Sequence, residues 1–181
     1  ISYGLNAIKN VGSKALETII EERKKNGPYE TIFDLCARVD QQKVNKRVLE
    51  SLIMSGSLDS IQGRRSEQFL SVDDAIKYGQ QIQNQTNLSQ VDLFGSLNAK
   101  NGLIKTPVLQ PAQAWSERES LKKEAEVLGL YVSGHPLLEH SDDLEEFTTI
   151  SFEENQEISK NDTVTIGAVS YTHLRAHETL R

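Results

Sequence analysis

The stretch Ile8-Lys9-Asn10-Val11-Gly12-Ser13-Lys14-Ala15 decides how the first part of the chain folds. Gly12 and Asn10 predict a tight hairpin, because asparagine adopts a left-handed backbone more readily than most residues. Apolar residues at helical spacing lie on both sides of it: Leu5 and Ile8 before, and Ala15, Leu16, Ile19 and Ile20 after. We therefore expect two helices around a short hairpin over residues 5–25, with Asn26-Gly27-Pro28 ending the second.

The hairpin resembles the helix-hairpin-helix motif, whose turn is Gly-apolar-Gly followed by a basic residue. Gly12 keeps the second glycine, Asn10 replaces the first, and Lys14 supplies the charge. Such a turn points backbone N–H groups outward at a helix start, where they favour a phosphate oxygen, and no side chain needs to reach a base. The predicted backbone-contacting residues are Asn10, Val11, Gly12, Ser13 and Lys14. The alternative is a plain helical hairpin with a glycine turn, and the hairpin alone does not separate the two.

Further short helices follow the hairpin. Thr31-Ile32-Phe33-Asp34 is typical of a capped helix start, and that helix should end near Val39. Asn45 should cap another helix that Gly56 ends, with a buried stripe of Val48, Leu49, Leu52 and Ile53. Residues 43–61 are thus interpreted as a second, degenerate helix-hairpin unit. Its candidate phosphate contacts are Lys43, Lys46 and Arg47, although a solvated helix end is an equal explanation for each lysine. Another helix opens at Ser66 and runs towards Gln85.

A polar stretch surrounds the adjacent apolar pair Leu93 and Phe94, and it holds too little apolar surface to order itself. Gln90 precedes Leu93 by three residues, and Gln-x-x-Leu-Phe resembles the short peptides that dock on the bacterial sliding clamp. The predicted clamp-binding residues are Gln90, Asp92, Leu93 and Phe94. Burying each of the two apolar side chains is worth roughly 1.5–3 kcal/mol, less the cost of ordering the segment. The alternative is that Leu93 and Phe94 pack back on their own domain.

The last third of the chain combines a helix, a turn and a strand pattern. Ser116 should cap a helix that Trp115 staples and Gly129 ends. His135, before Pro136, is interpreted as a turn-forming structural residue, because no carboxylate or cysteine stands at a supporting spacing. An acidic helix should run from Leu137 to Phe147, and Thr163–Val169 alternates as a strand does.

Composition limits the function classes. The 181 residues include 25% charged and 37% apolar side chains, a net charge of −6 and a single cysteine, Cys36, which excludes an internal disulfide. Residues 1–50 carry nine Lys/Arg and seven Asp/Glu, whereas residues 115–160 carry four and twelve. Any phosphate contact should therefore lie in the N-terminal part. The sequence contains neither a signal-peptide pattern nor an apolar run long enough for a membrane span, so no membrane partner is expected.

Several blocks in the same order resemble the bacterial DNA polymerase III alpha-subunit family over about residues 1–169: Ile8–Gly12, Phe33–Arg38, Asn45–Gly56, Gln90–Phe94 and Leu128–Leu137. The resemblance implies a mainly α fold. It would consist of a tandem helix-hairpin-helix DNA-binding domain over 1–82 and a flexible linker with the clamp motif over 83–114. A helical connector over 115–160 and the first strand of a truncated OB-fold over 161–169 would follow. Residues 170–181 depart from the family and are interpreted as a non-native read-through tail.

The resemblance also implies what the chain does. It is expected to be an internal piece of a bacterial, cytoplasmic DNA-directed DNA polymerase whose catalytic aspartates and Mg²⁺ belong to a palm domain before Ile1. No catalytic or metal-binding residue and no cofactor is therefore expected here. The implied partners are duplex primer–template DNA, the sliding clamp (beta subunit) and other replicase holoenzyme subunits. Two alternatives stay open, a non-enzymatic helix-hairpin-helix repair adaptor and the error-prone paralogue of the same polymerase.

Overall fold

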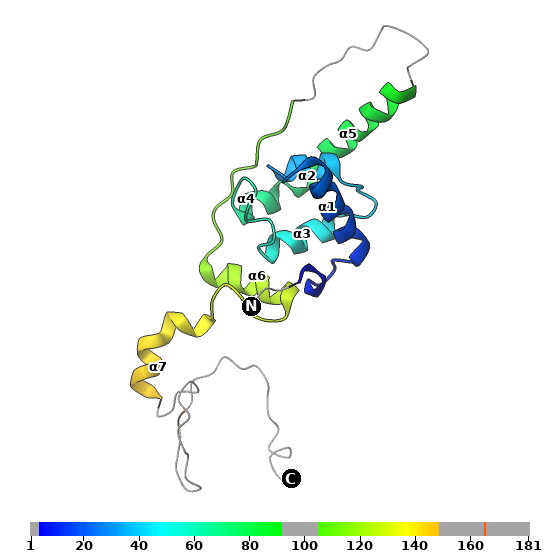
Figure 1. Ribbon diagram of the computed structural model, residues 1–181. Helices are drawn as coiled ribbons and strands as arrows, with labels where there is room; N and C mark the ends of the chain where they lie inside the picture. The colour runs from blue at the N-terminus through cyan, green and yellow to red at the C-terminus, as the bar shows by residue number, and fades with distance from the viewer. Residues whose placement is uncertain (1–3, 92–104, 149–164, 166–181) are drawn as a thin grey trace. The chain divides into compact units, whose positions relative to one another are not determined.

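The computed structural model describes residues 4–91, 105–148 and 165 (Figure 1). Contacts divide the chain into two compact units, Ile1–Val132 and Ser133–Arg181. The described residues form helices and turns without a strand, which confirms the mainly α prediction. None of the described helices has both the length and the apolar character that crossing a membrane requires.

Short helices build the first unit. Its described elements are a 3-10 turn, η1 (Leu5–Ala7), and the helices α1 (Ser13–Asn26), α2 (Ile32–Arg38), α3 (Lys46–Met54), α4 (Arg65–Leu70), α5 (Val72–Val91) and α6 (Glu117–Leu128). Figure 1 shows α1 to α4 gathered in one cluster, from which α5 runs outward.

The predicted helix ends form as local chemistry requires. Backbone N–H groups three residues further on donate, at 3.0, 3.1 and 3.1 Å, to the side-chain oxygens of Thr31, Asn45 and Ser116. Glycines with positive φ follow α1, α3 and α6, where a left-handed residue ends a helix without a Cβ penalty: Gly27 at 84°, Gly56 at 75° and Gly129 at 78°. These boundaries were predictable because each depends on residues within one turn.

The helix expected before the hairpin is wrong in length, because it is only the single turn η1. Ile8 already has an extended backbone, with φ −74° and ψ 123°. The N–H of Lys9 donates to the carbonyl oxygen of Val127 in α6, at 2.8 Å, instead of to Leu5. A tertiary hydrogen bond thus replaces the one that would have continued the helix.

Two other expected elements also differ. The helix expected from Ser66 divides at Ser71, whose φ of −88° and ψ of 1° depart from helical values, and α5 continues past Gln85 to Val91. The second helix-hairpin unit expected over residues 43–61 contains one helix, α3, between turns. Both differences arise from backbone turns that the apolar periodicity alone does not reveal.

The core of the first unit lies between α1, α2, α3 and α5. All four residues of the predicted α3 stripe are buried: Val48, Leu49, Leu52 and Ile53. Helix α2 packs along α5 at Gly79, where an added Cβ would overlap the carbonyl oxygen of Cys36 and Nε2 of Gln41. Gln83 Nε2 donates to the carbonyl of Val39 at 2.7 Å, which satisfies an acceptor at the end of α2.

Helix α6 belongs to the same unit as the hairpin, although about a hundred residues separate them. Val127 of α6 is 5% exposed within the core, and α6 packs on α3. The buried carboxylate of Glu124 accepts a hydrogen bond from the N–H of Val132, at 3.4 Å. Thus α6 closes one side of the helical body.

In the second unit, the helix expected over Leu137–Phe147 is two elements, the 3-10 helix η3 (Pro136–His140) and α7 (Ser141–Phe147). His140, the last residue of η3, interrupts the helical backbone before α7 with φ −120° and ψ 24°. His135 precedes η3, and its Nδ1 accepts a hydrogen bond from the N–H of Leu137 at 3.3 Å, which agrees with the predicted turn-forming role. The expected strand over 161–169, except Thr165, and the tail over 170–181 lie outside the described residues.

Candidate nucleic-acid interface

The predicted hairpin forms an exposed turn between η1 and α1. Asn10 has a φ of 68°, the left-handed conformation predicted for the position of the missing first glycine. Val11 is buried, at 7% exposure, and its N–H donates to the carbonyl of Ile8 at 3.2 Å. Val11 therefore anchors the turn, whereas Gly12, Ser13 and Lys14 lie on the surface.

The start of α1 presents open hydrogen-bond donors. The N–H groups of Ala15 and Leu16 donate to the carbonyl of Gly12, at 3.1 and 3.2 Å. Those of Gly12, Ser13 and Lys14 have no hydrogen-bond partner among the described residues. The first turn of α1 contains no acidic side chain that would occupy them. Three donors and the positive end of the helix dipole are thus available to a phosphate oxygen.

Gly12 is not required by the fold. Its φ of −80° and ψ of 155° are open to any residue, and an added Cβ would meet no atom within 4 Å. The missing side chain leaves the hairpin surface bare beside the open N–H groups. Such a bare surface allows close backbone approach to a ligand, a recurrent use of glycine.

A hydrogen bond connects the hairpin to α3. Asn10 Nδ2 donates to Oγ of Ser51, 3.3 Å away. Arg47 stands four residues before Ser51, and residues at this spacing share one face of a helix. The structure therefore brings Arg47, predicted from a separate segment, to the side of α3 that carries the hairpin contact.

Two of the predicted lysines are engaged in ion pairs. Lys46 Nζ lies 2.8 Å from a carboxylate oxygen of Asp73 in α5, and this hydrogen bond raises the pKa of the Lys46 ammonium. Lys43 Nζ lies 3.4 Å from Asp40. Their positive charges are partly offset, so these two lysines are weaker candidates for phosphate contact than the sequence suggested.

Three cations near the hairpin have no ion-pair partner among the described residues: Lys9, Lys14 and Arg47. Lys9 was not among the predicted contacts. Its position directly before Asn10 was the available signal, because residues flanking a tight turn lie on the same surface. We add Lys9 to the candidate interface on its exposure and its place in the turn.

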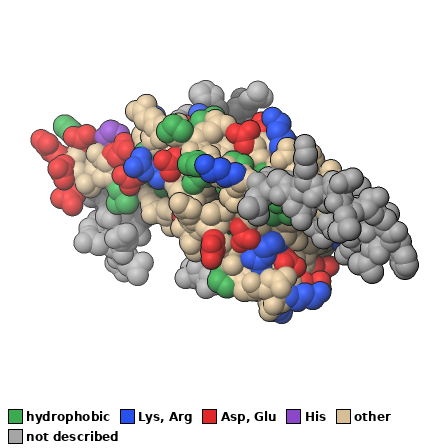
Figure 2. Space-filling view, turned by 90° about the horizontal axis from the view of Figure 1, so that it is seen from above, with side chains coloured by type: hydrophobic (Ala, Val, Ile, Leu, Met, Phe, Trp, Pro, Cys, Tyr) green, Lys and Arg blue, Asp and Glu red, His purple; other side chains and the backbone are tan. Residues whose placement is uncertain are grey.

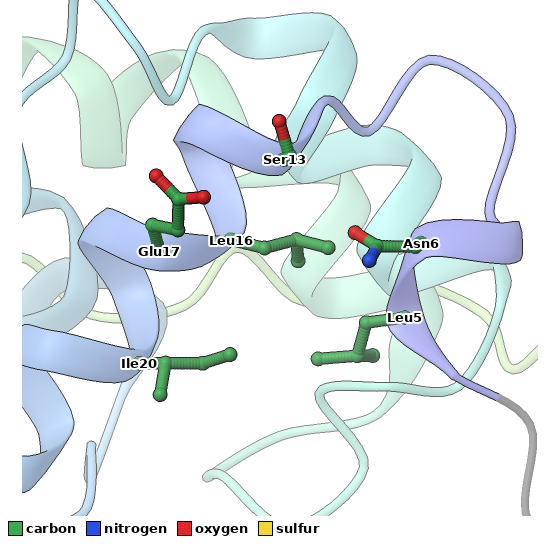
Figure 3. A pocket seen from close by; sticks show the side chains of 6 residues that line it. All are labelled: Leu5, Asn6, Ser13, Leu16, Glu17 and Ile20. Atoms are coloured by element: carbon green, nitrogen blue, oxygen red, sulfur yellow. The ribbon is translucent and has the colours of Figure 1, made fainter.

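A shallow pocket of about 230 Å³ lies beside this interface, between η1 and α1. Figure 3 shows Leu5 and Asn6 of η1 facing Leu16 and Ile20 of α1, with Ser13 and Glu17 at the rim. Ser13 belongs to both the pocket and the open start of α1. The pocket is largely apolar, and Glu17 places a negative charge in its wall, so the pocket is a poorer phosphate site than the hairpin.

Charge is distributed unevenly over the described surface. Figure 2 shows acidic side chains gathered around η3 and α7, the segment that carries Glu139, Asp142, Asp143, Glu145 and Glu146. Elsewhere on the visible face, basic and acidic side chains are intermingled. The acidic segment disfavours phosphate contact in the second unit.

The remaining predicted site residues are not tested by the structure. Asp92, Leu93 and Phe94 lie outside the described residues, and Gln90 falls within the bounds of α5 without a described side chain. In the described part of the chain, no group of three or more His, Cys, Asp or Glu could hold a metal ion. Burial raises the pKa of the Cys36 thiol to about 12, which disfavours a nucleophilic role for that residue.

The similarity of this chain to known proteins extends well beyond the hairpin. A family model described as a helix-hairpin-helix motif matches residues 1–68. DNA polymerase III subunit alpha of Vibrio cholerae is 37% identical over 169 residues, 93% of this chain and 14% of that protein. The subunit of the same name from Escherichia coli K12 is 41% identical over 147 residues, which cover 81% of this chain and 13% of that protein. The one from Borreliella burgdorferi is 39% identical over 151 residues, which cover 83% of this chain and 13% of that protein. The chain thus spans about one seventh of the length of these curated relatives.

Proposed function

The chain belongs to the DNA polymerase III alpha-subunit family, and we propose that its helical body binds the backbone of duplex DNA without reading the base sequence. The observation that carries this proposal is the open start of α1. The N–H groups of Gly12, Ser13 and Lys14 have no partner within the described part of the chain, and the Lys14 side chain is exposed. Arg47 lies on the face of α3 whose Ser51 accepts a hydrogen bond from Asn10. These groups suit phosphate oxygens, whereas none is arranged to read a base edge.

The whole protein would then be a DNA-directed DNA polymerase of replication, with primer–template duplex as its DNA substrate. The chemistry, attack of a primer 3′-hydroxyl on a deoxynucleotide helped by Mg²⁺, belongs to a palm domain outside this chain. We assign this chain the binding of DNA, and the metal-dependent chemistry stays an expectation for the palm domain. Contacts with other replicase subunits remain a prediction of the family.

We further propose that Gln90, Asp92, Leu93 and Phe94 tether the enzyme to the sliding clamp. The support is the Gln-x-x-Leu-Phe pattern and its place after the helix-hairpin-helix region in a chain related to a replicative polymerase. A weak contact of this kind, in cis with a DNA-binding body, raises overall affinity through effective concentration. DNA binding and the clamp contact would therefore act together.

The alternative function, a non-enzymatic repair adaptor, explains the similarity to known proteins less well. An adaptor would share the helix-hairpin-helix region, residues 1–68. The polymerase relatives instead match 81–93% of the chain, including residues well beyond that region. This extended match favours the polymerase over the adaptor.

Fluorescence anisotropy with two duplexes of equal length and unrelated sequence tests the DNA contact. We expect the chain to bind both with the same affinity and to lose affinity steeply with salt. The variant Lys14→Glu should bind both duplexes at least tenfold more weakly, and Lys77→Glu, on the exposed face of α5, serves as the matched charge control. Equal loss in both variants would overturn the hairpin assignment.

Binding to a purified bacterial sliding clamp tests the tether. The double variant Leu93→Ala with Phe94→Ala should lose at least tenfold in affinity, because each side chain contributes roughly 1.5–3 kcal/mol of apolar burial. Val108→Ala is the control, since Val108 is 84% exposed and outside the motif. If the double variant binds as tightly as the control, the tether proposal is wrong.

A further inference from the structure

Helix α6 lies outside the helix-hairpin-helix match, which covers residues 1–68, yet it contacts the hairpin directly. The carbonyl oxygen of Val127, in the last turn of α6, accepts a hydrogen bond from the N–H of Lys9 at 2.8 Å. The Val127 side chain is buried in the same cluster as Ile8 and Val11, which flank the turn. Val127 therefore holds the hairpin with its backbone and joins the core that anchors it.

The geometry of the turn makes the N–H of Lys9 available for this contact. The N–H of Val11 donates to the carbonyl of Ile8 at 3.2 Å, and a positive φ falls on Asn10 but not on Lys9. This is the pattern of a type II turn in which Lys9 is the second residue and Asn10 the third. The hydrogen bond of the turn itself does not use Lys9, whose N–H instead fixes the turn to α6.

Two helices thus hold the turn. Asn10 Nδ2 donates to Oγ of Ser51 in α3, while Lys9 donates to Val127 in α6. Helices α3 and α6 also pack on each other. Because the open N–H groups of residues 12–14 follow the turn directly, any movement of the turn also moves the groups assigned to phosphate binding.

Helix α6 is fastened to the body by contacts that do not involve the hairpin. Trp115, two residues before α6, packs edge-on against Phe69 of α4, with ring centroids 5.6 Å apart. Glu124, in the middle of α6, is 2% exposed. The hydrogen bond to Asp59 raises the pKa of Arg65 in α4, and the negative charge of Glu124 adds to this effect. The contacts with α3 and α4 therefore set where the Val127 carbonyl lies.

We propose that α6 is a positioning element of the DNA interface, so that docking of α6 and binding of the DNA backbone stabilise each other. The inference rests on the proposed DNA binding. If the hairpin is correctly oriented only while α6 is docked, loosening α6 lowers the apparent affinity in proportion to the oriented fraction. By linkage, bound DNA strengthens the docking of α6 by the same factor.

Comparing Lys9→Pro with Lys9→Ala isolates the hydrogen bond to Val127. Both variants lose the lysine charge, but only proline removes the N–H and places its ring against the Val127 carbonyl. Proline suits the second residue of a type II turn, and Ile8, with φ −74° and ψ 123°, has the extended backbone that the residue before proline requires. The turn itself is therefore kept.

We expect Lys9→Pro to bind duplex DNA about three- to tenfold more weakly than Lys9→Ala, which corresponds to the loss of one net hydrogen bond. Fluorescence anisotropy with the same duplex measures both affinities. Equal affinities, or tighter binding by Lys9→Pro, would overturn the proposal, because a preformed turn would then be sufficient without α6.

A second pair of variants separates positioning from general stability. Val127→Ala loosens α6, whereas Gly79→Ala disturbs the contact between α2 and α5 and is the control for loss of stability. With both variants folded by circular dichroism, only Val127→Ala should lower DNA affinity, about threefold or more. Its salt slope should stay at the wild-type value, because no phosphate contact is removed. Equal losses of affinity in the two variants would contradict a positioning role.

Hydrogen exchange measures the coupling in both directions. Without DNA, the N–H groups of Lys9 and Val11 should exchange about fivefold faster in Val127→Ala than in the wild type or in Gly79→Ala. Bound duplex should slow exchange of the Gly129 N–H, which donates to Ala125 at the end of α6, by a larger factor than exchange of the Val39 N–H at the end of α2. Equal factors would mean general stabilisation and no coupling.

Failure of the DNA function and failure of the positioning role can be told apart. If the wild-type chain binds no duplex, the proposed function is wrong, while exchange at Lys9 and Val11 still decides whether α6 orients the hairpin. Should Val127→Ala fail to fold, the comparison of Lys9→Pro with Lys9→Ala, which leaves the core side chains intact, decides the proposal.

Discussion

Asn10 Nδ2 donates a hydrogen bond to Oγ of Ser51 at 3.3 Å, and this contact joins the hairpin to α3 across 41 residues of sequence. It fixes the turn whose left-handed residue is Asn10 itself. Arg47, four residues before Ser51, lies on the same face of α3 as this contact. The candidate interface is therefore assembled from two segments that only the tertiary structure joins.

Replacing Gly12 with alanine should separate binding from folding. A Cβ at this position meets no atom within 4 Å, so the free energy of unfolding should fall by less than about 1 kcal/mol. Affinity for duplex DNA should fall several-fold, because the methyl group covers the bare surface beside the open N–H groups. Gly4→Ala is the matched control, since Gly4 is equally open but lies outside the hairpin. Identical DNA affinities for the two variants would contradict the assignment.

The salt dependence of DNA binding should show which of Lys14, Arg47 and Lys46 contact phosphate. Lys14→Ala and Arg47→Ala should each reduce the slope of log affinity against log salt by about 0.9, the loss of one phosphate contact. Lys46→Ala should change the slope less, because its ammonium is already held by Asp73 at 2.8 Å. Titrations at several salt concentrations measure this, and a larger effect at Lys46 would reverse the proposed order.

Gly79→Ala should destabilise the fold although it lies within a helix. In an exposed helix, glycine to alanine stabilises by about 1 kcal/mol. Here the new methyl group would overlap the carbonyl oxygen of Cys36, so α2 and α5 must move apart. We expect a net loss of about 1–3 kcal/mol in chemical denaturation. A stabilised variant would show that the two helices pack less closely than described.

Tyr29 should make the fold sensitive to alkaline pH. Burial raises the pKa of Tyr29 to about 12, above its ordinary value of 10.0, and its hydroxyl donates to the carbonyl of Ile19 at 2.9 Å. Because the unfolded chain loses the phenol proton first, the stabilisation is complete below pH 10 and is lost as pH rises towards 12. Tyr29→Phe should cost about 1 kcal/mol at neutral pH.

Denaturation from pH 8 to 12 checks the Tyr29 prediction. The Tyr29→Phe variant should lose stability less steeply above pH 10 than the wild type does. Cys36, whose pKa burial also raises to about 12, titrates in the same range and should be replaced by alanine in both chains. Parallel curves for the two chains would exclude Tyr29 as the source.

Residue patterns within one or two turns were sufficient for much of the fold. The caps at Thr31, Asn45 and Ser116 and the glycine ends at Gly27 and Gly129 form as predicted, because each depends on neighbouring side chains and on local backbone freedom. The hairpin and its left-handed Asn10 were predictable for the same reason.

The sequence by itself therefore determined where most of the helices begin and end, which α3 residues are buried, and the hairpin turn at Asn10. Only the tertiary structure decided what depends on distant partners. The carbonyl of Val127 ends the first helix early by accepting from the N–H of Lys9. Ser71 accepts from the N–H of Gln110, and Ser51 accepts from Asn10 of the hairpin. Such hydrogen bonds join residues 39 to 118 positions apart, and no local periodicity specifies which distant group will supply the partner.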